Sequence, residues 1–87
     1  MNGEVRYHPE SLTVSGDCDQ LGAIREFVEH FLTARNILSD NVNFIVLAVD
    51  EACSNIMRHA KVRQKLKTLN IKLHLDKDML TIEIEDN

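Results

Sequence analysis

Three polar side chains stand four residues apart in the second half of the chain: Glu51, Asn55 and His59. At 100° per residue this spacing aligns them along one face of a helix, apart from the face formed by the neighbouring apolar residues. Asn is an indifferent helix former, so a purely solvent-facing surface would be expected to carry Glu, Lys or Gln instead. A neutral amide oxygen one turn after a carboxylate suits Mg²⁺ bound to phosphates. The alternative is that these residues are simply the polar face of an amphipathic helix.

A fourth candidate, Asp86, follows a segment in which apolar residues occupy every second position. Leu80, Ile82 and Ile84 are even-numbered, as is Asp86, and alternate residues of a strand point to the same face. The Asp86 carboxylate is therefore predicted to point toward the buried side of a sheet, where it needs a hydrogen-bond donor. The alternative is that the strand frays before Asp86.

The polar stripe needs a long helix, and the sequence predicts two helices. Asp17 and Gln20 have the spacing of a capping box, and apolar residues follow at helical intervals to about Arg35. After a break, a second apolar set with the same period predicts a helix over residues 40–60 or a turn beyond. The second helix carries the polar stripe.

The remaining segments alternate with a period of two, which is typical of strands. The apolar residues are odd-numbered in segment 69–75 and even-numbered in segment 80–84. If the two segments pair as antiparallel strands, these residues share one face of the sheet only when the numbers of paired residues add up to an odd value. A sum of 155 fits best and sets Leu73 opposite Ile82, with a loop over residues 76–79.

Apolar alternation also occurs on either side of Pro9, near the start of the chain, and predicts one interrupted edge strand. Together these elements predict an α/β fold: a two-layer sandwich in which two helices pack on one face of a mainly antiparallel sheet. Residues 1–87 would form one domain, because a chain of this length has no room for a second core.

The ten residues from Glu51 to Ala60 resemble the N-box of the GHKL (Bergerat-fold) ATPases. Their pattern, E-x-x-x-N-x-x-x-H-A, together with Leu-Gly-Ala-Ile-Arg-Glu-Phe in the first helix, is most similar to the anti-sigma-factor serine/threonine kinases. The last six residues, Ile-Glu-Ile-Glu-Asp-Asn, resemble the lead-in to the D-x-G-x-G motif of these proteins, with Asp86 as its aspartate.

The resemblance implies a role for each candidate residue. Asn55 would coordinate the Mg²⁺ that bridges the ATP phosphates, and Glu51 would be the general base for a serine hydroxyl on an antagonist protein. Asp86 would accept a hydrogen bond from the adenine amino group. His59 would be a structural member of the motif, because phosphoryl transfer chiefly needs charge neutralisation and positioning. Arg25 would either contact a partner or be an ordinary solvated arginine.

The function implied is that of a cytoplasmic anti-sigma factor and serine-protein kinase, which uses Mg-ATP to phosphorylate an anti-sigma-factor antagonist and also binds a sigma factor. Because the chain stops at Asn87, we expect a partial histidine-kinase-like ATPase domain that is truncated before the glycine-rich motif. On its own it is expected to bind ATP weakly or not at all and to be inactive. The alternative is a non-catalytic protein-interaction module. An unpaired strand edge would favour a homodimer or other self-association.

Composition narrows the function classes. Of the 87 residues, 44% are hydrophobic and 28% charged, which is ordinary for a folded globular domain. The net charge of -4 disfavours direct binding to nucleic acid or anionic membrane. Five basic residues between Arg58 and Lys67 could meet phosphate, or could instead complement the end of a helix dipole. With no export signal, Cys18 and Cys53 are interpreted as reduced thiols.

Overall fold

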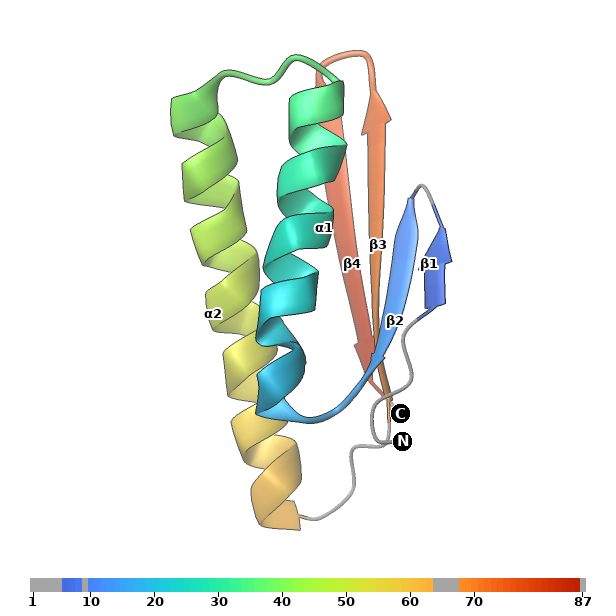
Figure 1. The fold of residues 1–87 in the computed structure, drawn as a ribbon, viewed down its shortest axis with the longest axis vertical. Coiled ribbons are helices and arrows are strands. Elements are labelled where there is room, and N and C mark those ends of the chain that lie inside the picture. Colours follow the sequence, from blue (N-terminus) through green and yellow to red (C-terminus); the bar gives the residue numbers. More distant parts are fainter. Residues whose placement is uncertain (1–5, 9, 64–67, 87) are drawn as a thin grey trace.

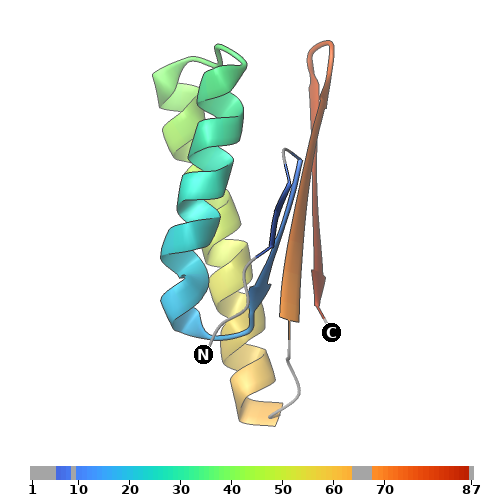
Figure 2. The same cartoon turned by 45° about the vertical axis from the view of Figure 1, so that its right-hand side comes forward.

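The computed structural model describes residues 6–8, 10–63 and 68–86, with side chains described for 10–59 and 68–86. Two helices cover one face of a four-stranded antiparallel sheet in the order β1-β2-β3-β4 (Figures 1 and 2). The predicted α/β two-layer fold is confirmed. Neither helix is long and apolar enough, within these ranges, to cross a membrane. The elements are β1 (Arg6–His8), β2 (Ser11–Ser15), α1 (Leu21–Ala34), α2 (Ser39–Arg63), β3 (Thr68–Asp76) and β4 (Met79–Asp86).

The register of the β3–β4 hairpin is the predicted one. Leu73 pairs with Ile82, and every other pair in the ladder has the same sum of residue numbers. The loop is shorter than predicted, because Asp76 and Met79 also pair and leave only two residues between the strands. The first of these, Lys77, has φ 56°, in the left-handed region.

The first two strands correct the prediction of one interrupted edge strand. β1 and β2 are separate strands that pair antiparallel, with Tyr7 opposite Leu12. On its other side β2 pairs with β3, where Leu12 lies opposite Ile71. β2 is therefore an inner strand, which explains why Leu12 and Val14 are fully buried. Val5, the first apolar residue of the alternation before Pro9, lies outside the described residues.

The start of α1 also differs from its prediction. The expected capping box is not formed: a short 3-10 helix, Cys18–Gln20, comes first, and the Asp17 side chain makes no capping hydrogen bond. Instead the Gln20 amide donates to the Asp17 carbonyl at 2.9 Å. The apolar face that was predicted is nevertheless the buried one, and it comprises Ile24, Phe27, Val28, Phe31 and Leu32.

The end of α1 is fixed by a Schellman motif. The Asn36 amide donates to the Thr33 carbonyl at 3.0 Å, and the Ile37 amide donates to the Leu32 carbonyl at 3.2 Å. Asn36 has φ 62°, the left-handed conformation that this motif requires. Ile37 packs against the core, which adds the apolar contact typical of the motif. The chain is thereby turned back so that α2 runs beside α1.

Substitution of Asn36 by Ala should lower the free energy of unfolding by roughly 1 kcal/mol, because a Cβ-bearing residue other than Asn or Asp is strained at this φ. Asn36→Gly should be neutral or slightly stabilising, since Gly adopts the conformation without strain. Urea denaturation of the two variants measures the difference. Equal free energies of unfolding for Asn36→Ala and Asn36→Gly would contradict the assignment of a Schellman motif at this position.

The core lies between the helix layer and the central strand. Leu69, Ile71 and Leu73 of β3 are at most 1% exposed. From α2 the buried residues are Val42, Val49, Cys53 and Met57. The inward residues of β4 are only half-buried, because β4 is at the edge of the sheet.

Candidate functional site

The predicted polar stripe lies on the accessible side of α2. Glu51, Asn55 and His59 are all exposed, while Cys53 and Met57 between them are buried. The prediction that the stripe and the apolar set occupy different faces of the helix is confirmed. The stripe therefore lies on the solvent-exposed side of α2, where a ligand can reach it.

The Asn55 amide oxygen is already an acceptor. The guanidinium Nη2 of Arg58, three residues further along the helix, donates a hydrogen bond to Asn55 Oδ1. Sequence reasoning missed this contact, although a spacing of three residues places two side chains side by side on a helix. A cation bound at Asn55 would have to displace Arg58, which would then be available to an anion.

Glu51 makes no hydrogen bond or ion pair with another described residue, in contrast to its neighbour Asp50. Arg25 Nη1 of α1 donates to Asp50 Oδ1 at 2.8 Å, and this ion pair links the two helices. Sequence reasoning did not single out Asp50. Because the Arg25 side chain is 50% exposed, the pair contributes only about 0.2–1 kcal/mol. It does hold the Arg25 guanidinium against α2.

Asp86 belongs to β4 and pairs with the buried Leu69 of β3. Directly opposite residues lie on the same face of a sheet, so Asp86 is on the side that faces the helices, as predicted. The strand does not fray before it. Asp86 is exposed and makes no hydrogen bond to another described side chain. Figure 1 shows β4 ending at the same end of the molecule as the second half of α2, which carries Asn55.

An apolar strip approaches Asp86 from within the two layers. Leu80, Ile82 and Ile84 of β4 pack against the core but remain half-buried, and so do Ile45 and Ile56 of α2. α2 lies on the β4 side of the helix layer in Figure 1. A carboxylate at the end of such a strip can accept a hydrogen bond from a flat heterocycle that rests on the apolar side chains.

Cys53 lies on the buried side of α2, two residues from both Glu51 and Asn55. Burial raises the pKa of this thiol to about 11, and the nearby negative charge of Asp50 adds to the shift. Both causes disfavour the thiolate. Cys53 is therefore a packing residue and not a nucleophile, whereas Cys18 is an exposed free thiol.

The stability of the fold should fall as the pH rises from about 8.5, the pKa of a thiol in the unfolded chain, to the folded value of about 11. In this window the folded state binds more protons than the unfolded state, so each rise in pH favours unfolding. Urea midpoints measured across the window should fall less steeply for Cys53→Ala than for the parent. In Cys18→Ala the urea midpoint should fall with pH as steeply as in the parent. If the parent, Cys53→Ala and Cys18→Ala all showed the same dependence on pH, the raised pKa of Cys53 would be refuted.

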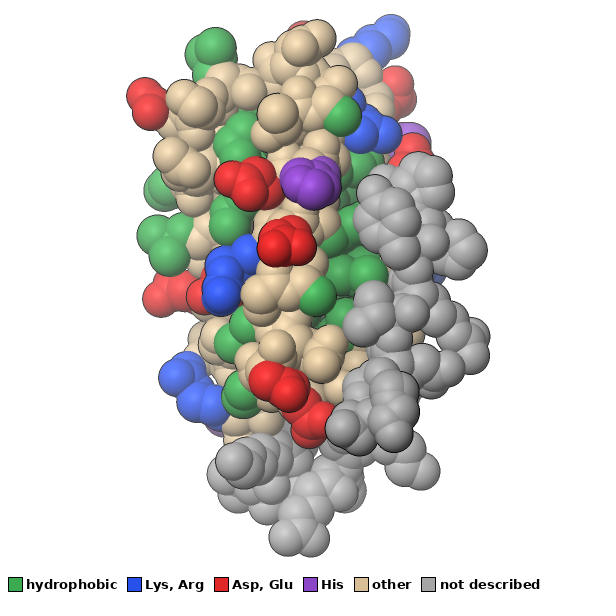
Figure 3. All heavy atoms as spheres, viewed as in Figure 1, with side chains coloured by type: hydrophobic (Ala, Val, Ile, Leu, Met, Phe, Trp, Pro, Cys, Tyr) green, Lys and Arg blue, Asp and Glu red, His purple; other side chains and the backbone are tan. Residues whose placement is uncertain are grey.

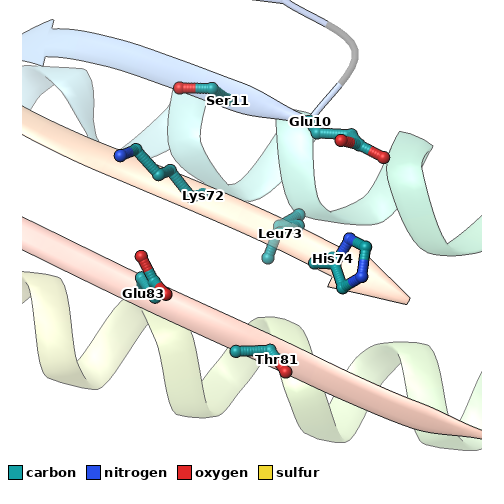
Figure 4. Close-up of a pocket in the computed structure, with 7 residues that line it drawn as sticks. All are labelled: Glu10, Ser11, Lys72, Leu73, His74, Thr81 and Glu83. Atoms are coloured by element: carbon teal, nitrogen blue, oxygen red, sulfur yellow. The ribbon is translucent and has the colours of Figure 1, made fainter. Parts of the chain in front are cut away.

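The opposite face of the sheet has a shallow hollow of about 260 Å³. Figure 4 shows Lys72 and His74 of β3 beside Thr81 and Glu83 of β4 at this hollow, with the helices behind the sheet. Acidic and basic groups are mixed there. Within residues 10–59 and 68–86, no three His, Cys, Asp or Glu side chains come together to hold a metal. The described side chains of this face therefore do not form a second candidate metal site.

The sequence of the chain matches a known protein family. No curated protein matches it. A family model described as histidine kinase-like ATPase domain matches residues 14–87. The match covers both helices and the β3–β4 hairpin, and with them Glu51, Asn55 and Asp86. The chain therefore belongs to the histidine kinase-like ATPase domain family.

Proposed function

We propose that the chain is the nucleotide-binding portion of an anti-sigma factor with serine-protein kinase activity, which binds Mg-ATP and phosphorylates an anti-sigma-factor antagonist. Family membership supports the binding of a nucleotide. The resemblance of the N-box and the first helix supports the more specific proposal of an anti-sigma-factor serine kinase. The observation that carries the proposal is the exposed pair Glu51 and Asn55, one turn apart on α2, with Asp86 at the end of the apolar strip.

The residues fit Mg²⁺ and ATP chemically. Asn55 offers a neutral oxygen and Glu51 a carboxylate, and Mg²⁺ characteristically takes only one or two protein ligands when phosphates supply others. When bound, Mg²⁺ neutralises phosphate charge and thereby makes the terminal phosphorus more electrophilic. In this proposal Asn55 holds the cation, and Asp86 accepts a hydrogen bond from the amino group of the base. Arg58, once displaced from Asn55, would face the phosphates.

In this proposal Glu51 is the general base that takes the proton of the attacking serine hydroxyl. Its carboxylate is exposed and has no described partner that would occupy its lone pairs. A carboxylate in this state can accept the proton of a serine hydroxyl as its oxygen bonds to the terminal phosphorus of ATP and the bond from that phosphorus to the leaving ADP breaks. His59 stays in a structural role, because it lies a further turn along the helix and the transfer needs only one base.

The partners in this proposal are proteins. They are a sigma factor and the antagonist whose serine is phosphorylated, both in the cytoplasm; Arg25 is a contact for one of them. β4 has no neighbour on its outer side among the described strands, so pairing of two copies along this edge would give a homodimer. Direct binding to nucleic acid is excluded from the proposal because the net charge is -4.

Titration of Mg-ATP by calorimetry tests the proposal, with residues 1–87 and with a version that continues into a glycine-rich motif. We expect Mg-dependent binding that is markedly tighter in the extended version, because backbone amides of glycine-rich loops bind phosphate. Absence of binding by the extended version, with its fold intact, would favour the alternative of a non-catalytic interaction module.

A further inference from the structure

A groove of about 600 Å³ runs between α1 and α2 on the side away from the sheet. Figure 3 views this helix face, where hydrophobic side chains gather over α2 among acidic and basic ones. The groove is separate from the proposed nucleotide site, which lies between α2 and β4. It is lined by Gly22, Arg25, Glu26, Glu29, Asn43, Val46, Leu47 and Asp50.

On the α2 side of the groove, the apolar residues Val46 and Leu47 lie between Asn43 and Asp50. Leu47 lines it and is 60% exposed, and Phe44, one turn earlier on the same side of α2, is 74% exposed. Val46 is half-buried beside them. A single exposed apolar residue needs no explanation, but a pair adjoining a groove forms a contact patch. Burial of two such side chains would favour binding of an apolar partner surface.

The remainder of the groove is acidic. Glu26 and Glu29 of α1 are exposed along one wall. Among the described residues of the lining, Arg25 is the only cation, and its charge is offset by Asp50 at 2.8 Å. Asp40, one turn before Phe44 on α2, adds another exposed carboxylate. A second copy of the chain would bring these carboxylates together, so the charge favours a cationic occupant over self-association.

We propose that this groove docks an amphipathic helix of a partner protein, in which Lys or Arg residues flank a pair of apolar side chains. The apolar pair would contact Phe44 and Leu47, and the cations would meet Glu26 and Glu29. Residues 22–29 of α1 span about 12 Å along the helix axis, the length of about two turns of such a partner. The proposal goes beyond the nucleotide-dependent function and does not rest on it.

The probe is a labelled peptide of about 18 residues, or about five helical turns, with Leu on one face and Lys flanking it. Its binding to the 87-residue chain is followed by fluorescence anisotropy. We expect Phe44→Gln with Leu47→Gln to weaken binding by at least about tenfold, because truncation of one interface hot-spot residue alone weakens binding about 30-fold or more. Glu26→Gln with Glu29→Gln should also weaken it and flatten its dependence on salt. All four positions are exposed, and circular dichroism verifies that the variants fold.

Matched controls lie elsewhere on the molecule. Met79 is 70% exposed at the start of β4, and Glu83 and Glu85 are exposed on the outer face of the sheet. Met79→Gln, and Glu83→Gln with Glu85→Gln, should leave peptide binding unchanged. Equal losses in these controls, or equal binding of a peptide with Glu in place of Lys, would overturn the proposal. So would self-association that disappears in the Phe44 and Leu47 variant, because the occupant would then be a second copy.

Discussion

Replacement of Glu51 by Gln is expected to lower phosphoryl transfer to an acceptor serine by about 10²- to 10⁴-fold, the usual effect of removing a general base. Gln keeps the shape of the side chain but cannot take up the serine proton. Mg-ATP affinity should stay within a few-fold, because Glu51 acts mainly as the hydroxyl loses its proton. Single-turnover transfer from radiolabelled ATP, in the version that carries the glycine-rich motif, measures the rate separately from binding.

Exposure of Glu51 makes this experiment easy to interpret. A substitution at an exposed helix position changes stability by only about 0.5 kcal/mol, so the variant should fold like the parent. Glu83→Gln is the matched control, because Glu83 is an exposed carboxylate on the opposite face of the sheet and should not affect transfer. Full activity of Glu51→Gln, or loss of activity that follows unfolding, would show that Glu51 belongs only to the polar face of α2.

The features that could be predicted from the sequence depend on local periodicity. The β3–β4 register followed from parity, because a shift by one residue would place the apolar residues of one strand on the wrong face. The position of Asp86 on the helix side of the sheet followed from the same argument, and its pairing with Leu69 confirms it. In α2, the 3.6-residue period separated Glu51 and Asn55 from the core.

The features that could not be predicted depend on contacts between distant segments or on one backbone conformation. β2 is an inner strand because it pairs with β3, some sixty residues away along the chain. The alternation of apolar and polar residues within β2 is the same for an inner strand and for an edge strand, so the sequence could not distinguish the two. The ion pair between Arg25 and Asp50 depends on how the helices pack. Asp17 and Gln20 have the residue types and spacing of a capping box. In the structure, however, the Gln20 amide donates to the Asp17 carbonyl within a 3-10 turn, and the Asp17 side chain makes no capping hydrogen bond.

Replacement of Asn55 by Ala should show whether this residue binds the cation or the nucleotide. We expect Mg-ATP affinity to fall about 10- to 100-fold, since an interaction with a charged group is worth about 1.5–3 kcal/mol. In the absence of Mg²⁺, parent and variant should bind ATP equally, because the amide oxygen of Asn55 is assigned to the cation and not to the phosphates. Transfer to serine should fall with binding, in contrast to the effect at Glu51.

Two further readouts distinguish this loss from structural damage. Ala is a better helix former than Asn, and Asn55 is exposed, so the variant should be as stable as the parent or slightly more stable. Arg58→Gln removes the donor that occupies Asn55 Oδ1; it should keep the dependence of binding on Mg²⁺, because the amide oxygen remains in place. If Asn55→Ala weakened ATP binding equally with and without Mg²⁺, the amide would be contacting the nucleotide directly, and the cation site would have to be assigned elsewhere.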